Sequence, residues 1–135
     1  MNKIIITGGL GFIGSHLTKK LLENNKVLVI DKMTYAANNS NLIKFNNNSN
    51  FFFEKKDVSN FKKIKNIIKD FKPDKIFHLA AESHVDRSID NADEFIKTNI
   101  LGTYSLLEAI LEYRKSFEKK ELIFHHVSTD EVFGD

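Results

Sequence analysis

Hydrophobic and polar residues come in blocks along this chain, and the blocks predict strands separated by helices. Five short apolar runs have the character of buried parallel strands, because they are rich in β-branched or aromatic residues and end in glycine or polar residues. They cover residues 3–6, 26–30, 51–56, 75–81 and 122–128. Apolar residues at helical spacing follow the first, third and fourth runs and predict three longer helices.

The three predicted helices differ in how clearly their ends are marked. The first opens at residue 12, directly after a glycine-rich turn, and the second is expected to use Ser59 as its N-cap and to stop at Pro73. The third is the longest and runs from residue 93 to 118. Its expected inward-facing residues are Phe95, Ile96, Ile100, Leu101, Leu106, Leu107, Ile110 and Leu111. The asparagine-rich stretch 33–50 is expected to be a surface loop with one helical turn.

Strands separated by helices of crossover length predict an α/β fold, a doubly wound, Rossmann-like parallel sheet with strand order 3-2-1-4-5. The ligand crevice of such a sheet lies where the order reverses, between the carboxyl ends of the first and fourth strands. We expect residues 1–135 to form one nucleotide-binding domain that is incomplete, since the later strands and a C-terminal substrate part are absent.

Composition narrows the classes of function. The net charge of +2 gives no basis for binding nucleic acid or an anionic membrane, and no apolar run reaches membrane-spanning length. The absence of cysteine excludes disulfides and thiolate metal sites, and no metal site is expected. A cytoplasmic location is expected, because the N-terminal apolar run is too short for a signal peptide.

The turn after the first strand carries the clearest chemical signal. Gly8, Gly11 and Gly14 stand between strand and helix, where glycines let the backbone approach a pyrophosphate that the helix N-terminus binds. Asp31 ends the second strand about 20 residues later, the position of an acid that binds the ribose hydroxyls of NAD and repels the phosphate of NADP. Lys32 weakens that preference, and the alternative is that Asp31 only caps a loop.

Reactive groups also follow the fourth and fifth strands. Ser83 and Arg87 could bind a phosphate or sugar of a substrate, although Arg87 and its neighbour could equally serve only to fix a loop. Asp130 and Glu131 are adjacent acids, which suit acid–base chemistry because one can stay protonated while the other is ionised. Thr129 could polarise a substrate oxygen, and the alternative for this segment is a solvated acidic loop.

Together these segments resemble the extended short-chain dehydrogenase/reductase superfamily and, within it, the family of dTDP-glucose 4,6-dehydratases. The resemblance covers essentially the whole chain. The glycine turn identifies only the superfamily. The runs His-Leu-Ala-Ala-Glu-Ser-His-Val-Asp-Arg-Ser at 78–88 and Ser-Thr-Asp-Glu-Val at 128–132 are more specific, because epimerases of the same fold usually lack the Asp-Glu pair.

The resemblance implies that NAD takes hydride from C4 of a nucleotide-linked glucose, that water leaves across C5 and C6, and that the hydride returns to C6. It implies that Asp130 protonates the leaving hydroxyl, Glu131 removes the C5 proton, Thr129 hydrogen-bonds the C4 oxygen and Ser83 contacts the substrate. It also implies a homodimer for the complete protein. The implied NAD site consists of Gly8, Gly11, Phe12, Ile13, Gly14, Asp31, Lys32, Met33, Thr34, Asp57, Val58, Leu79, Ala80, Ala81, Glu82, Ser83 and Thr98.

Two departures from the family pattern stand out. Phe133 occupies a position where the family usually has tyrosine. The family's Tyr-x-x-x-Lys pair is missing, because the residues four after Tyr35, Tyr104 and Tyr113 are asparagine, glutamate and phenylalanine. We therefore expect the chain alone to be inactive. A non-catalytic NAD-binding remnant, or a nucleotide-sugar epimerase or decarboxylase of the same superfamily, remain the alternatives.

Overall fold

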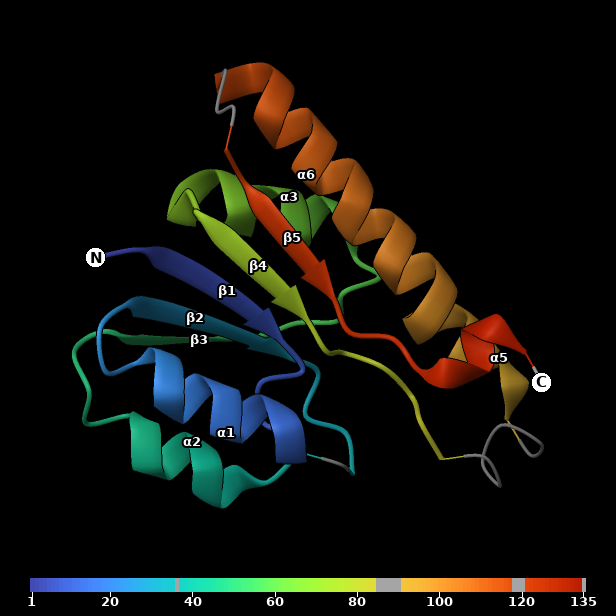
Figure 1. Cartoon of the computed structure of the whole chain (residues 1–135), viewed down its shortest axis with the longest axis horizontal. Helices are drawn as coiled ribbons and strands as arrows, with labels where there is room; N and C mark the ends of the chain where they lie inside the picture. Colours follow the sequence, from blue (N-terminus) through green and yellow to red (C-terminus); the bar gives the residue numbers. More distant parts are fainter. Residues whose placement is uncertain (36, 85–90, 118–120, 135) are drawn as a thin grey trace.

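The computed structural model describes residues 1–35, 37–84, 91–117 and 121–134. Their strands form one parallel sheet in the order β3-β2-β1-β4-β5, which confirms the predicted fold class and strand order (Figure 1). The strands are β1 (Lys3–Thr7), β2 (Lys26–Asp31), β3 (Phe51–Lys55), β4 (Lys75–His78) and β5 (Ile123–His126).

Alternation along the central strands divides the core into two parts. Ile5 of β1 lies opposite Leu28 of β2 and Ile76 of β4, and all three pack on one face of the sheet. Ile4 and Ile6 point to the other face. Because both faces are apolar, helices must cover the sheet on both sides.

Helices of the described residues cover both faces of the sheet (Figure 1). α1 (Phe12–Leu21) and α2 (Asn39–Phe45) cover the face of Ile4 and Ile6, while α3 (Phe61–Phe71) and α6 (Thr103–Phe117) cover the face of Ile5. The segment 33–50, expected to be a surface loop with one helical turn, contains a longer helix than predicted. α2 has seven residues and buries Phe45 in the core, because its ring packs on Phe51 of β3.

The predicted N-cap of α3 was wrong by one residue. Asn60, not Ser59, caps the helix, and its side-chain oxygen accepts a hydrogen bond from the Lys63 N–H at 3.2 Å. Ser59 instead donates its hydroxyl to Asp57, so its side chain is turned away from the helix. Ile64 and Ile68 are fully buried, as the apolar stripe predicted.

The predicted long helix is continuous but not regular. α5 (Ala92–Phe95) leads into a π-helical segment, η1 (Ile96–Gly102), and then into α6. Of the eight side chains expected inward, only Leu106 and Ile110 are buried. The helix is apolar on two sides, and only one of these sides packs on the sheet. The wider turns of η1 also change which side chains of the helix lie on the same side. The side chains left 40–61% exposed are Ile96, Ile100, Leu101, Leu107 and Leu111.

β4 and β5 are three and two residues shorter at their carboxyl ends than the sequence predicted. β1 turns away at Gly8, so the Ala80 N–H meets the Thr7 hydroxyl rather than a strand carbonyl, and pairing stops. Residues 79–81 and 127–128 therefore lie in loops at the edge of the crevice. Among the described helices, none combines the length and apolar character that crossing a bilayer requires.

Candidate functional site

The turn between β1 and α1 is packed between both neighbouring strands. Gly8 has φ +71°, and a Cβ there would lie 2.8 Å from the backbone N of Ala80. Its own N–H donates to the carbonyl of Ile30 at 2.9 Å, which ties the turn to β2. A Cβ on Gly14 would lie 2.2 Å from the Gly8 carbonyl oxygen. These two glycines are therefore required by the packing of the protein itself.

Gly11 is different, because packing within the protein does not require it. It is the N-cap of α1, and a Cβ there would touch only the Gly8 carbonyl, at 3.5 Å. No side chain caps the helix and no acidic residue lies in its first turn. Phe12 and Ile13 are 82% and 63% exposed at the same place. The open N–H groups of this turn can therefore bind an anion such as a phosphate.

Asp31 holds two backbone segments together at the end of β2. Its Oδ2 accepts from the Leu10 N–H at 3.0 Å, and its Oδ1 accepts from the Met33 N–H at 2.8 Å. Met33 has φ +61°, so the chain bends sharply there. The bond to Met33 is the loop cap considered as the alternative for Asp31. The bond to Leu10 was missed, because it depends on Leu10 lying beside β2. A carboxylate has about four acceptor positions, so ribose hydroxyls can still bind.

Charged residues gather beside Asp31, at the end of β3. The Nζ of Lys32 lies 3.1 Å from Asp57 Oδ2 and 2.9 Å from Glu94 Oε2 on α5. The Ser59 N–H and hydroxyl both donate to the other Asp57 oxygen, at 2.9 and 2.7 Å. Val58 is buried against η1. The ends of β2 and β3 and the start of the long helix thus meet at one side of the crevice.

His78 connects β4 to β1 and α6. Its Nδ1 accepts from the Thr7 hydroxyl at 2.6 Å, and its Nε2 lies 3.0 Å from the Thr103 hydroxyl. That hydroxyl donates to the carbonyl of Asn99, so it accepts from His78, whose proton is on Nε2. Burial, with a smaller effect of the nearby His126 charge, lowers the pKa of His78 to about 4. His78 is therefore neutral and structural.

Asn99 is a positioning residue that the sequence reasoning missed. Its side-chain oxygen accepts from the Glu82 N–H at 2.8 Å, and its side-chain N–H donates to the Glu82 carbonyl at 2.9 Å. The hydroxyl of Tyr35, on the loop after β2, donates to the Glu82 carboxylate at 3.3 Å. The only signal in the sequence was an amide within an apolar helical pattern. The loop after β4, which contains Leu79 to Ser83, is thereby held at the crevice.

Thr98 is 8% exposed, and its hydroxyl has no hydrogen-bond partner among the described residues. A buried hydroxyl without a partner costs about 1–3 kcal/mol of stability. A ligand in the crevice is one source of such a partner.

Of the three predicted acid–base residues, the structure describes the side chains of Thr129 and Asp130. Thr129 and Asp130 follow β5, at the same edge of the sheet, but both are exposed. Within the part of the chain that the structure describes, neither side chain makes a hydrogen bond. Ser83 is also exposed. Arg87 and the side chain of Glu131 lie outside the described residues.

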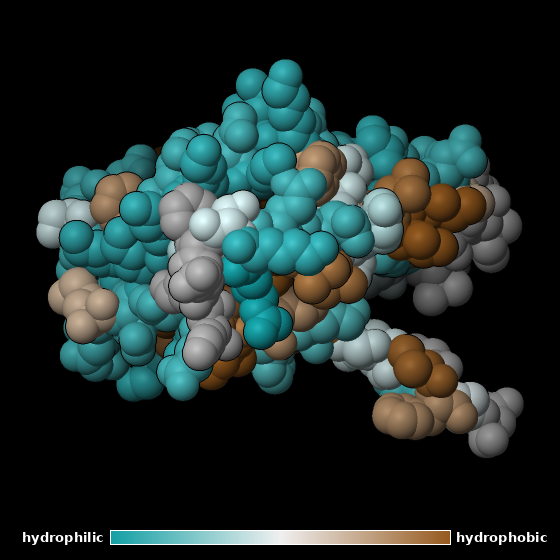
Figure 2. All heavy atoms as spheres, turned by 90° about the horizontal axis from the view of Figure 1, so that it is seen from above, coloured by the Kyte–Doolittle hydropathy of each residue, from teal (hydrophilic) through white to brown (hydrophobic). Residues whose placement is uncertain are grey.

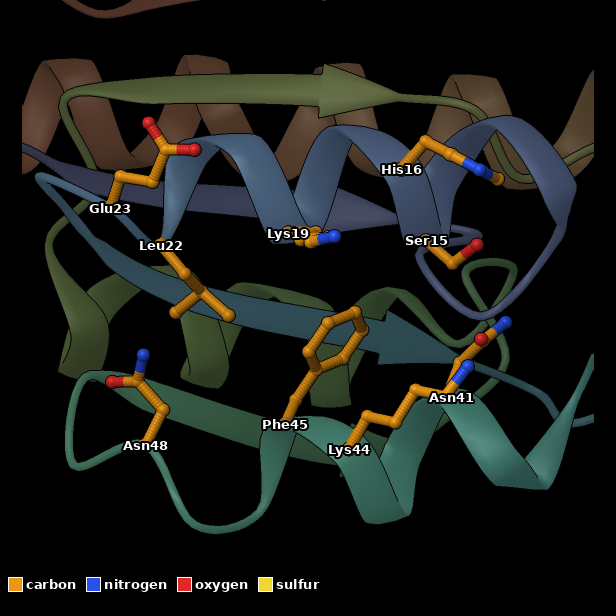
Figure 3. Close-up of a pocket in the computed structure, with 9 residues that line it drawn as sticks. All are labelled: Ser15, His16, Lys19, Leu22, Glu23, Asn41, Lys44, Phe45 and Asn48. Carbon is orange, nitrogen blue, oxygen red and sulfur yellow. The ribbon is translucent and has the colours of Figure 1, made fainter.

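A groove of about 560 Å³ lies apart from the crevice, between α1 and α2 (Figure 3). Leu22 and Phe45 point toward each other across it, and Lys19 and Lys44 flank it. It contains none of the predicted site residues.

Comparison with known proteins identifies the family. The sequence profile of the GDP-mannose 4,6 dehydratase family matches residues 5–135. The chain belongs to this family. A dTDP-glucose 4,6-dehydratase of Haemophilus influenzae is 49% identical over 140 aligned positions, which cover 100% of this chain and 41% of that protein. The predicted resemblance is thus confirmed, and the chain spans about two-fifths of the length of the curated relatives it matches.

Solved structures of the family's fold also match. A dTDP-glucose 4,6-dehydratase of Bacillus anthracis, in complex with NAD, has a TM-score of 0.83 at 31% identity, over 100% of this chain and 40% of that one. A UDP-glucose 4-epimerase of Thermotoga maritima, with UDP-glucose, has a TM-score of 0.76 at 35% identity, over 90% of this chain and 37% of that one. The fold alone does not separate these two activities.

Proposed function

We propose that this chain forms the NAD-binding part of a nucleotide-sugar 4,6-dehydratase, with dTDP-glucose as the substrate. The observation that carries the proposal is the uncapped first turn of α1. It opens beside the loop after β4, and Asp31 lies at the end of the neighbouring strand β2. The 49% identity to a dTDP-glucose 4,6-dehydratase supports the choice of reaction over the epimerase alternative.

Three features of the crevice fit NAD. The helix N-terminus suits the pyrophosphate, and Gly11 has open space where a ligand can approach the backbone. The hydroxyl of Thr98 is buried without a partner among the described residues. NAD supplies the hydride acceptor of the reaction. The residues proposed to line its site are those at the ends of β1 to β4, namely 8, 11–14, 31–34, 57–58 and 79–83, together with Thr98.

The chain's own residues then bind the sugar and move protons. We propose that Ser83 contacts the substrate, that Thr129 donates a hydrogen bond to the sugar C4 oxygen, and that Asp130 protonates the leaving C6 hydroxyl. Glu131 takes the C5 proton, whose acidity comes from the neighbouring ketone. The exposure of Thr129 and Asp130 at the carboxyl edge of the sheet leaves both accessible to a bound nucleotide sugar.

We further propose that the chain alone does not turn over substrate. None of its tyrosines is followed four residues later by lysine, so the pair that the resemblance implies as the base for the C4 hydroxyl is missing. A non-catalytic NAD-binding remnant is the second candidate function. The missing tyrosine–lysine pair favours it.

A homodimer is proposed for the complete protein, and the surface of η1 and α6 supports it. Five exposed apolar residues recur three or four positions apart on this helix. Figure 2 shows hydrophobic side chains gathered toward the end of the molecule where α5 lies in Figure 1. Contiguous apolar surface of this kind usually marks an interface. We define the apolar stripe as Ile96, Ile100, Tyr104, Leu107 and Leu111.

The substitution Gly11→Ala tests cofactor binding at the turn. The new methyl group has space in the protein but lies where the backbone would approach the pyrophosphate. We expect the affinity for NADH, measured by fluorescence titration, to fall at least about tenfold, while the free energy of unfolding changes by less than about 1 kcal/mol.

Gly14→Ala is the contrasting variant, since its Cβ would meet the Gly8 carbonyl and disturb the fold itself. Unchanged NADH affinity in a well-folded Gly11→Ala variant would contradict the proposed site. Failure of the folded original chain to bind either NAD or NADH would contradict the proposed function. Formation of a 4-keto sugar from dTDP-glucose by the chain alone would contradict its proposed inactivity.

A further inference from the structure

A cluster of five charged residues lies where the adenosine half of the cofactor is proposed to bind. Lys32 directly follows Asp31, at the end of the strand where a basic residue can accommodate the 2′-phosphate of NADP. Its ammonium group is already held by Glu94 and Asp57, at 2.9 and 3.1 Å. Lys97 on η1 lies 3.8 Å from the same Asp57 oxygen.

The ionisation of these groups follows from their contacts. The hydrogen bond to Glu94 is the largest effect on the pKa of Lys32 and raises it, against the effect of burial. The same bond lowers the pKa of Glu94. Burial raises the pKa of Asp57, but hydrogen bonds from Ser59 and from Lys32 outweigh it and keep that pKa below its usual value. Lys32, Glu94 and Asp57 are therefore charged at neutral pH.

The balance of charge in the cluster disfavours a phosphate. The cluster contains three carboxylates, counting Asp31, and two ammonium groups, so it has one excess negative charge. Two of the three N–H bonds of Lys32 have carboxylate partners. A 2′-phosphate could use only the remaining N–H, and it would lie beside both carboxylates, which repel it.

We propose that Glu94, together with Asp57, makes the site prefer NAD over NADP by holding the ammonium group of Lys32. The inference rests on the proposed cofactor site. It assigns a specificity role to a residue on α5, far from the glycine turn in sequence, and it explains how a lysine beside Asp31 is compatible with a preference for NAD. Glu94 is the residue to change, because Asp57 is itself proposed to contact the cofactor.

The test compares the affinities of the chain for NADH and NADPH, each measured by fluorescence titration. Glu94→Gln keeps the shape of the side chain and removes its charge. We expect NADPH to bind about fivefold more tightly than to the original chain, the effect of one partly exposed ion pair, and NADH affinity to change less than about twofold.

Glu112→Gln is the matched control. Glu112 lies on α6, its side chain is 42% exposed like that of Glu94, and it also pairs with one lysine, Lys65. Removing its charge should leave the ratio of the two affinities unchanged. In the double variant Glu94→Gln/Lys32→Met, the gain in NADPH affinity should disappear, because the cation that binds the phosphate is gone.

Each outcome separates the inference from the function it rests on. Normal NADH binding with an unchanged affinity ratio in Glu94→Gln would overturn the inference and leave the proposed function standing. A gain that persists without Lys32, or one equally large in Glu112→Gln, would also overturn it. If the original chain binds neither NADH nor NADPH, the proposed function is refuted and the inference with it.

Discussion

At the scale of single residues, the crevice depends on side chains whose role is to hold loops. Asp31 clamps the turn before α1, Asn99 holds the backbone of Glu82, and His78 joins β4 to β1 and α6. Each of these contacts joins residues distant in sequence. Their polar groups are buried or half-buried, so losing one partner leaves the other unsatisfied.

His78 gives the chain a pH-dependent stability. The pKa of His78 is about 4 in the folded chain and 6.5 in the unfolded chain, so the unfolded chain binds more protons between these values. The contribution is fully present above pH 6.5 and is lost as the pH falls toward 4. We expect it to be about 3 kcal/mol, from urea unfolding measured across this range.

His78→Gln is the comparison, since glutamine keeps a donor and an acceptor but does not titrate. Its unfolding free energy should fall less steeply over the same range. Equal slopes for the two proteins would show that His78 does not control this dependence.

At the scale of elements, local sequence explains most helix ends but not every cap. Ser59 and Asn60 are both good N-cap residues, and which one caps α3 depends on Asp57. Asp57 takes the Ser59 hydroxyl, and Asn60 is left to accept from Lys63. The ion cluster and the start of α3 are therefore connected through one short segment.

Asn60→Ala should destabilise the chain by about 1 kcal/mol, because the Lys63 N–H loses its partner at the helix N-terminus. Asn60→Asp keeps an acceptor there and should retain the stability. Chemical denaturation of both variants tests this. If alanine and aspartate have the same effect at this position, the cap does not contribute as the geometry indicates.

At the scale of the whole molecule, the helical layer of α3 and α6 leaves apolar surface uncovered. α6 buries Leu106 and Ile110 on the sheet side, while the apolar stripe remains exposed on another side. A second helical surface packed on the stripe would explain why this helix is apolar on both sides. This is the physical basis of the proposed homodimer.

In the complete protein, Leu107→Glu should weaken self-association at least about thirtyfold, or about 2 kcal/mol, because a charge would be buried in the interface. Ile43→Glu is the control, since Ile43 on α2 is exposed but lies outside the stripe. Sedimentation velocity of both variants provides the measurement. A Leu107→Glu variant of the complete protein that associates like the unsubstituted complete protein would exclude the stripe as the interface.

The sequence determined the strands and the position of the glycine turn, because hydrophobic periodicity and backbone requirements are local properties. The strand order followed from the rules that govern helical crossovers in parallel sheets. Tertiary structure decided which side of the long helix is buried, where β4 and β5 stop, which residue caps α3, and which partners hold Lys32 and Asp31. These depend on groups brought together from distant segments, such as Glu94 beside Lys32 and Leu10 beside Asp31. No local pattern encodes those distances, so only the folded chain could reveal them.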